Sequence, residues 1–142
     1  MNTYTLAILK PDCIQKNLIG EVIIKIQEAG FKIAALKMTR LDEKTAAGFY
    51  QVHKGKPFFE GLIKYMTESA VIPMVLEKDN AVEDFRKLIG ATDPLKAAEG
   101  TIRKLWAESV TRNMVHGSDS DENASIEISY FFSKKEIIEN LK

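Results

Sequence analysis

The sequence predicts an α+β fold in one domain over residues 1–142, with helices packed on a four-stranded antiparallel sheet. Three observations support this prediction. A length of 142 residues fits a single domain of ordinary size. Apolar patterns with strand and helix periods alternate along the chain. No repeat, low-complexity tract or linker rich in Gly, Ser and Pro divides it.

The first part of the chain predicts a strand, a helix and a second strand. Residues 3–10 carry apolar side chains on both faces, which indicates a central strand, and Pro11 is expected to end it. Residues 17–29 show the i, i+3, i+4, i+7 spacing of an amphipathic helix, and Gly30 is a suitable terminating residue. Residues 31–41 predict the second strand.

Two helices and a third strand are expected next. Asp42 can cap a helix whose apolar stripe reaches His53, and Pro57 is well placed at the start of another helix. Residues 71–77 predict the third strand. Pro73 cannot donate to a strand ladder, so we expect this strand at a sheet edge or at a bulge.

Asn80 resembles the start of a capping box, and it opens a predicted helix that Gly90 closes. Arg86 lies at the border of the apolar face of this helix. Residues 90–112 predict a long, partly helical loop, and loops of this length are usually functional. Residues 113–116 indicate a short strand.

Residues 121–132 fit two interpretations, because Ile126, Ile128 and Tyr130 alternate like a strand while residues 121–124 resemble a helix start. The whole order is βαββαβ, which is the split βαβ or ferredoxin-like arrangement.

Composition excludes several classes of protein. Hydrophobic residues make up 45% and charged residues 28%, unlike a disordered or collagenous chain. Lys plus Arg and Asp plus Glu are both 20, so the net charge is zero. This argues against a polybasic membrane binder or a nucleic-acid coat. We therefore expect no membrane partner and no specific nucleic acid.

The expected location is the cytoplasm. A single cysteine, Cys13, cannot form an intrachain disulfide. The longest apolar runs, such as 70–76, fall far short of the ~20 residues that span a bilayer. Residues 1–4 lack the basic and apolar regions of a signal peptide.

Common nucleotide and metal signatures are absent from the sequence. It contains no P-loop, no G-x-G-x-x-G and no protein-kinase motif. Only His53 and His116 are histidines, so a His-rich metal site is not expected. His53 and Cys13 are interpreted as structural, and the basic residues Lys54, Lys56 and Lys64 as a solvated face.

His116 is the strongest candidate for chemistry. Val115 precedes it in an apolar segment, Gly117 permits a tight turn and close ligand approach, and Ser118 and Asp119 offer hydrogen-bond partners. A neutral imidazole held through one nitrogen is a good nucleophile through the other. The alternative is an ordinary surface histidine in a loop.

The segment Asn113-x-x-His116-Gly117-Ser118-Asp119 resembles the active-site signature of nucleoside diphosphate kinases. Further segments resemble the same family in order and at family spacing over about residues 3–132. They are Ile8-Leu9-Lys10-Pro11-Asp12, Phe49-Tyr50-x-x-His53, Pro57-Phe58-Phe59-x-x-Leu62, Gly90-Ala91-Thr92-Asp93-Pro94 and Gly100-Thr101-Ile102-Arg103.

This resemblance implies a reversible two-step exchange. A nucleoside triphosphate, mainly ATP, would pass its γ-phosphoryl group to Nδ1 of His116, and a nucleoside diphosphate would then take it. Such transfer needs positioning and charge neutralisation more than further covalent chemistry. The exchange would maintain the pools of nucleoside and deoxynucleoside triphosphates.

The resemblance also implies that the long loop at about 90–112 lies on the substrate side, and it implies roles for residues around His116. Four residues would contact the phosphates: Lys10, Arg86, Thr92 and Arg103. Asn113 would bind the sugar 3′-hydroxyl and the adjacent phosphate region. Phe58 would stack on the base, with Leu62 one helical turn later, and Tyr50 would lie near the histidine. Ser118 and Glu127 would orient the ring, which favours the helical interpretation of 121–132.

For several of these residues an ordinary structural role is the alternative. Lys10 could be a solvated strand end, Arg86 a helix flank, and Phe58, Leu62 and Tyr50 parts of the core. Mg²⁺ is expected to arrive on the nucleotide phosphates, with Asp119 as the nearest protein candidate to assist it.

The family also implies a homotetramer or homohexamer. Residues 104–106 are bulkier than the family pattern, and the end at Lys142 resembles the shorter microbial members; both features bear on assembly. Two rival functions are a non-catalytic module that binds a nucleotide or protein, and a nuclease or DNA-binding role. The sequence keeps every charged catalytic position of the family, which argues against the non-catalytic module. The zero net charge gives no support to a nuclease or DNA-binding role.

Overall fold

The fold is a four-stranded antiparallel sheet with helices on both faces, described for residues 2–140 in a computed structural model. Met1, Leu141 and Lys142 lie outside the described residues, and so does the expectation based on the end at Lys142. The strand order is β2-β3-β1-β4, which confirms the ferredoxin-like prediction. The strands are β1 (Asn2–Leu9), β2 (Lys32–Leu36), β3 (Ile72–Asp79) and β4 (Val115–Gly117).

Seven α-helices and three short 3₁₀ turns are described within residues 2–140. The helices are α1 (Pro11–Gln15), α2 (Ile19–Glu28), α3 (Glu43–Phe49), α4 (Phe59–Met66), α5 (Ala81–Ile89), α6 (Ile102–Trp106) and α7 (Asp121–Phe131). The 3₁₀ turns are η1 (Gln51–His53), η2 (Pro94–Lys96) and η3 (Lys134–Glu136).

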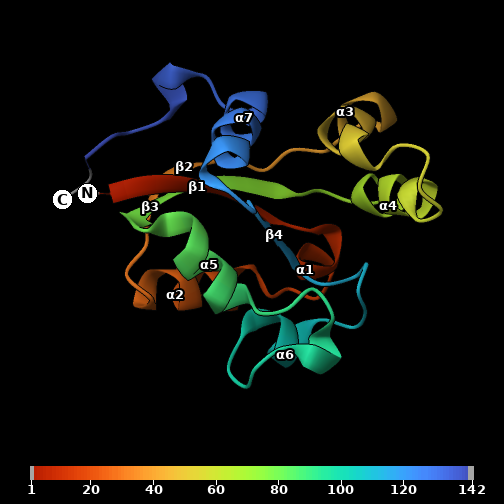
Figure 1. Cartoon of the computed structure of the whole chain (residues 1–142), viewed down its shortest axis with the longest axis horizontal. Coiled ribbons are helices and arrows are strands. Elements are labelled where there is room, and N and C mark those ends of the chain that lie inside the picture. The colour runs from red at the N-terminus through yellow and green to blue at the C-terminus, as the bar shows by residue number, and fades with distance from the viewer. Residues whose placement is uncertain (1, 141–142) are drawn as a thin grey trace.

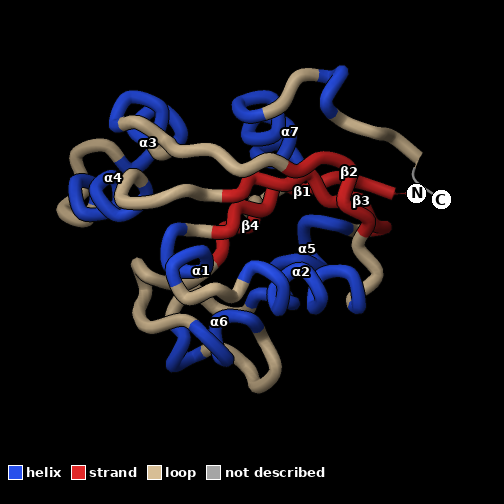
Figure 2. Tube along the Cα trace, turned by 180° about the vertical axis from the view of Figure 1, so that it is seen from behind, coloured by secondary structure: helices blue, strands red, loops and turns tan. Residues whose placement is uncertain are grey.

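The sheet separates two apolar layers (Figure 1). Leu6 and Ile8 of β1 face α3, α4 and α7, whereas Ala7 and Leu9 face α2, α5 and α6. Seen from behind, the strands lie between these two groups of helices (Figure 2). β1 is therefore a central strand with two buried faces, as its sequence pattern predicts.

The segment after β1 differs from the prediction. Pro11 ends β1 but also begins the short helix α1, where its fixed φ suits the first helical position. Asn17 then adopts a left-handed φ of 58°, so the predicted helix 17–29 begins only at Ile19. Gly30, with φ 95°, ends it as expected.

Pro73 does not lie at a sheet edge, because β3 pairs with β2 on one side and β1 on the other. Its carbonyl oxygen accepts from the backbone N–H of Lys37 at 3.2 Å, one residue beyond the end of β2. In an antiparallel strand the N–H and the C=O of one residue face the same neighbouring strand. The N–H that Pro73 lacks would therefore face the position where β2 has already ended. The sheet's bulge lies in β2, between Ile33 and Ala35, and β2 is shorter than the predicted strand 31–41.

The predicted capping box at Asn80 is also wrong. Asn80 is left-handed, with φ 57°, and its side chain donates to Glu83 at 3.0 Å instead of capping the helix. The N–H of Ala81 is bound by the Thr3 hydroxyl at 2.9 Å. By contrast, the predicted cap at Asp42 is confirmed, since its carboxylate accepts from the Thr45 N–H at 2.7 Å.

Two other predicted boundaries differ, since α3 ends at Phe49, short of His53, and α4 begins at Phe59, two residues after Pro57. Residues 90–112 form a long connection that contains η2 and α6, and residues 121–131 form the helix α7. The short strand β4 begins two residues later than predicted. Within residues 2–140, none of the helices combines the length and apolar character that crossing a membrane requires.

Candidate active site

His116 lies at the middle of β4, directly opposite Ile8 of β1. Residues opposite each other in an antiparallel pair share a face, so the imidazole points to the side that α7 covers. Gly117 is buried and points to the other side, where an added Cβ would lie 2.9 Å from the Phe85 ring of α5. The predicted role of Gly117 in a tight turn is therefore wrong: it allows β4 to pack closely on α5.

The His116 ring is held by a carboxylate from α7. Its Nε2 lies 2.8 Å from Glu127 Oε1, and the Ser118 hydroxyl donates to the same oxygen at 2.8 Å. The Ser118 oxygen in turn accepts from the Leu6 N–H at 3.2 Å. A carboxylate only accepts hydrogen bonds, so this geometry places the ring proton on Nε2 and the lone pair on Nδ1.

Lys10 follows β1 directly, and its side chain is buried, with the residue only 7% exposed. Its ammonium donates to Asn113 Oδ1 at 2.7 Å, and the Asn113 amide donates to Val110 O at 2.9 Å. Burial, and secondly the charge of Arg103, lower the pKa of Lys10 to about 7. A cation held in this way gains stability from an incoming anion.

Arg103 connects the loop 90–112 to β4. Its guanidinium donates to Gly90 O at 2.9 Å and to Val115 O at 2.8 Å. Burial, followed by the nearby charge of Arg86, lowers the pKa of Arg103 to about 10. Lys10, Arg86 and Arg103 thus form a cluster of positive charge, and Arg103 binds the residue before His116, although the chain as a whole carries no net charge.

Three further predicted residues lie on the exposed part of the site. Arg86 and Thr92 are exposed, and Phe58 is 49% exposed. The backbone carbonyl of Thr92 lies 3.4 Å from the Asn113 amide nitrogen, which brings the loop to the same place as Lys10. Leu62, in contrast, is buried in the core beside α4's other apolar residues.

Aromatic rings run from Phe58 towards His116. Phe58 contacts His53, His53 stacks with Tyr50, and their ring centroids are 5.3 and 6.4 Å apart. Phe49 contacts both Tyr50, at 4.9 Å, and His116, at 5.3 Å. Burial raises the pKa of Tyr50. This arrangement places Tyr50 near the imidazole, with Phe49 between them.

Two buried polar atoms in this region lack a hydrogen-bond partner among residues 2–140: the Tyr50 hydroxyl and Arg103 Nε. Buried polar groups are normally satisfied, so exceptions at a candidate site are informative. Both atoms belong to residues predicted from the sequence to lie at the site.

The protein itself supplies few metal ligands. Asp119 is exposed and accepts from the Asn123 side chain at 2.6 Å. No group of three His, Cys, Asp or Glu suited to an ion occurs in the described part of the chain. Oxygen-preferring cations such as Mg²⁺ often bind through a substrate's phosphates with few protein ligands, which is compatible with this arrangement.

Sequence reasoning missed two residues. Phe49 shared the apolar stripe of Tyr50 and was assigned to no site, yet it contacts the His116 ring. Asp12 belongs to a family segment but received no role, although its buried carboxylate contacts the strand that leads to His116. For Asp12, the signal in the sequence was a charged residue next to Pro11 in an apolar setting.

The surroundings of the residues interpreted as structural or solvated are compatible with that interpretation. Cys13 is fully buried, and burial raises its pKa to about 12, which keeps the thiol protonated. His53 lies 3.4 Å from Lys56 through Nδ1 and Nζ. Lys54, Lys56 and Lys64 are exposed, as expected of a solvated face.

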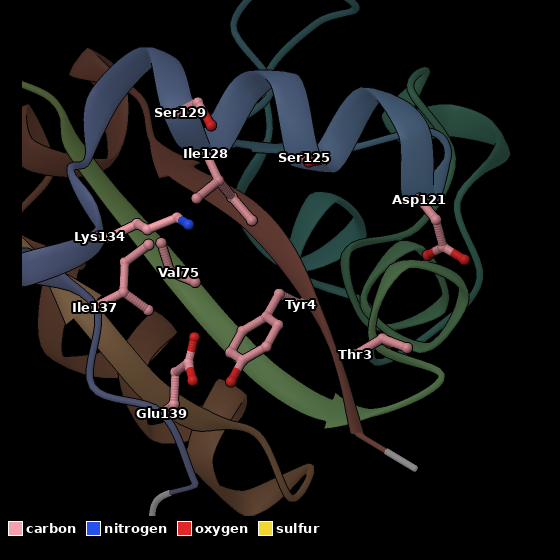
Figure 3. Close-up of a pocket in the computed structure, with 10 residues that line it drawn as sticks. All are labelled: Thr3, Tyr4, Val75, Asp121, Ser125, Ile128, Ser129, Lys134, Ile137 and Glu139. Carbon is pink, nitrogen blue, oxygen red and sulfur yellow. The ribbon is translucent and has the colours of Figure 1, made fainter.

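A cavity of about 480 Å³ lies elsewhere, between the start of β1, α7 and the segment after α7 (Figure 3). Tyr4, Ile128 and Glu139 line it together with seven other residues. None of its lining residues is a predicted site residue, so this cavity is separate from the site around His116.

Comparison with known proteins places this geometry in context. A family model described as nucleoside diphosphate kinase matches residues 3–137. The nucleoside diphosphate kinase of Chloroherpeton thalassium is 62% identical over 137 residues, which cover 96% of this chain and 97% of that protein.

Two solved structures are also similar. The nucleoside diphosphate kinase of Aquifex aeolicus has a TM-score of 0.94 at 38% identity, covering 97% of this chain and all of that one. A halophilic nucleoside diphosphate kinase from Halobacterium salinarum, solved in complex with CDP, has a TM-score of 0.95 at 35% identity. That match covers 100% of this chain and 95% of the other.

Proposed function

The chain belongs to the nucleoside diphosphate kinase family, and from that premise we propose that His116 carries the phosphoryl group between nucleotides. The enzyme is a phosphotransferase that exchanges a terminal phosphoryl group between a nucleoside triphosphate and a nucleoside diphosphate. The observation that supports His116 most directly is its 2.8 Å contact with Glu127, which engages Nε2 and leaves Nδ1 as the nucleophile.

The proposed exchange has two balanced steps. In the first, the Nδ1 lone pair attacks the γ-phosphorus and forms an N–P bond, while the bond to the bridging oxygen breaks and its electron pair leaves on the diphosphate. In the second, a terminal oxygen of another diphosphate attacks the same phosphorus. The N–P bond then breaks and its electron pair returns to the ring.

The positive cluster would bind the phosphates during both steps. Lys10 and Arg103 are fixed by hydrogen bonds to Asn113 Oδ1 and to two backbone carbonyls, so little reorganisation is needed when charge develops. Arg86 and the Thr92 hydroxyl would complete the contacts from the exposed side. Asn113, beside Lys10, would bind the sugar 3′-hydroxyl.

Phe58 would hold the base by stacking, with Leu62 beneath it and Tyr50 near the imidazole. A stacking platform discriminates poorly among bases, because every base has a π-face. We therefore infer broad base tolerance, with ATP as the main donor.

Mg²⁺ is the proposed cofactor, held mainly by the nucleotide phosphates with assistance from Asp119. When bound, it would neutralise part of the phosphate charge. The residues of this chain bind and orient the nucleotide, and Glu127 keeps the proton of His116 on Nε2.

We also infer a homotetramer or homohexamer that works in the cytoplasm. Large apolar side chains are exposed near the edge strand β2, including Leu36 and Met38, and on α2 at Ile24. Exposed apolar side chains at a sheet edge can become buried when subunits pack together. Analytical ultracentrifugation would distinguish four from six subunits.

The test of the proposed function is phosphoenzyme formation. We expect γ-labelled ATP and Mg²⁺ to place label on the wild-type protein that survives base and is lost in acid. His116→Ala should take no label, whereas His53→Ala, which removes the other histidine, should still take it. Unlabelled wild-type protein, or full exchange activity in His116→Ala, would contradict the proposal. Nucleotide binding without transfer would favour a non-catalytic module.

A further inference from the structure

Asp12 is a buried carboxylate that the proposed mechanism does not use. It lies in α1, two residues after Lys10, and is fully inaccessible to solvent. Oδ1 accepts a hydrogen bond from the Tyr65 hydroxyl of α4, and Oδ2 accepts one from the backbone N–H of Met114 at 3.0 Å. Burying a charge without partners is costly, so these two contacts are necessary for Asp12 to remain there.

The backbone at Met114 is strained. Its φ is 77°, and the N–H of Val115 donates to the carbonyl of Asn113 at 2.9 Å across it. This is the γ-turn with positive φ, a rare and unfavourable conformation for a residue with a side chain. Such a conformation persists only where the surroundings fix it from several sides.

Three contacts fix Met114. Its N–H is bound by Asp12, its carbonyl accepts from the Lys10 N–H at 2.9 Å, and its side chain is fully buried in the core beneath the sheet. Of the two hydrogen bonds, only the one to Asp12 involves a side chain. That side chain is itself held by Tyr65, whose ring also lies near the Arg112 guanidinium, at 4.9 Å.

The strained turn separates Asn113 from His116, which lies in β4. Asn113 precedes it and contacts Lys10, while His116 follows two residues after it and faces Glu127. The turn therefore sets the relative direction of the amide and the imidazole. A change in the turn would move the Asn113 amide relative to Lys10 and the His116 ring relative to Glu127.

We propose that Asp12, held by the Tyr65 hydroxyl, is a positioning residue that fixes the Met114 turn and thereby aligns Asn113 and His116. This inference rests on the proposed role of His116. It assigns α4 a second task, because the helix that carries Leu62 also stabilises the turn through Tyr65. Asp12 acts on Met114 through the backbone, its charge also favours the charged form of Lys10, and it touches no substrate.

The test is the single-turnover rate of His116 labelling by saturating γ-labelled ATP, expressed per labelled site. A misplacement of about 1 Å can slow a reaction about 100-fold, and we expect a loss of this order in Asp12→Ala. Asp12→Asn keeps an oxygen that can accept from Met114, and it should recover most of the rate. Tyr65→Phe should lose about fivefold, with the KM for ATP changed less than about twofold.

Tyr130→Phe is the matched control, because it also removes one tyrosine hydroxyl, which in this case donates to the backbone carbonyl of Thr45 at 2.8 Å. Its labelling rate should stay at the wild-type value. If Asp12→Ala does not fold, Tyr65→Phe and Asp12→Asn decide between the outcomes.

Wild-type labelling rates in Tyr65→Phe, or no recovery in a folded Asp12→Asn variant, would overturn the inference. A rise in KM with an unchanged rate at saturation would also overturn it. These results differ from failure of the proposed function, in which the wild-type protein itself takes no label at His116.

Discussion

The site has a buried half and an exposed half, and the two are built in different ways. Lys10, Arg103, Asn113 and Ser118 are each no more than 8% exposed, and each makes hydrogen bonds to other parts of the protein. Arg86, Thr92 and Phe58 are exposed. The groups of the buried half are thus fixed by folding, whereas we expect those of the exposed half to become ordered only when a nucleotide binds.

This division has an energetic reason. A preorganised cation stabilises developing charge without reorganisation, but its burial disfavours the charged form. The lowered pKa values of Lys10 and Arg103 reflect that cost. For exposed groups the cost of burying a charge is small, and their main cost is the side-chain entropy that they lose when they bind a ligand.

The largest effect should come from the buried half. Lys10→Met keeps the length of the side chain but removes the charge beside Asn113. We expect kcat/KM to fall about 10²- to 10³-fold, as for removal of one preorganised donor, with most of the loss in kcat. Steady-state exchange assays measure this. A loss confined to KM would mean that Lys10 only contributes to binding.

The second effect is a pH dependence of stability. Lys10 has a pKa of about 7 in the folded protein and about 10.5 when ordinarily solvated. Between these values the unfolded chain holds the proton and the folded protein releases it, so the free energy of unfolding rises with pH, by a few kcal/mol.

Lys10→Met removes this dependence. Relative to the wild type, the variant should be most stable near pH 6, and its advantage should shrink as the pH approaches about 10. Urea unfolding at fixed protein concentration measures both curves. Curves that stay parallel across this range would contradict the assigned pKa.

Gly117→Ala tests whether close packing, and not a turn, explains this glycine. The added methyl would lie 2.9 Å from Phe85 and 3.1 Å from Ile89. Overpacking of this kind costs about 1–3 kcal/mol and would shift β4 with His116. Urea unfolding and exchange assays should both report a loss; unchanged stability would mean that α5 can move away freely.

The smallest effect should come from the exposed half. Phe58→Ala removes a stacking surface of the kind worth about 1–3 kcal/mol per base, so we expect KM to rise about tenfold while kcat stays near wild type. Phe58→Tyr, which keeps the ring, should restore KM. A large fall in kcat would break the proposed distinction between the two halves.

Much of this fold could be predicted from apolar spacing. The pattern of residues 3–10 identified the central strand, and Asp42 identified a helix start, because these features depend on local chemistry. The expectations for Pro73 and Asn80 were wrong because each depends on a distant partner. β2 ends opposite Pro73, and Thr3 binds the N–H of Ala81, where a cap at Asn80 was expected.

The site shows the same limit. Residues in the family segments, such as Lys10 and His116, could be placed by resemblance. Glu127 could not be placed by spacing, since its segment also alternates like a strand, and only the contact with His116 makes its position clear. Asp12 escaped notice because its role depends on Tyr65, which lies 53 residues away in sequence.

A single oxygen of Glu127 receives both the imidazole and the Ser118 hydroxyl, and that hydroxyl is bound in turn to the backbone of β1. The carboxylate is consequently anchored to the sheet as well as to its own helix. If α7 shifted during catalysis, Ser118 would keep the Glu127 carboxylate next to His116, and the imidazole would keep its tautomer throughout each turnover.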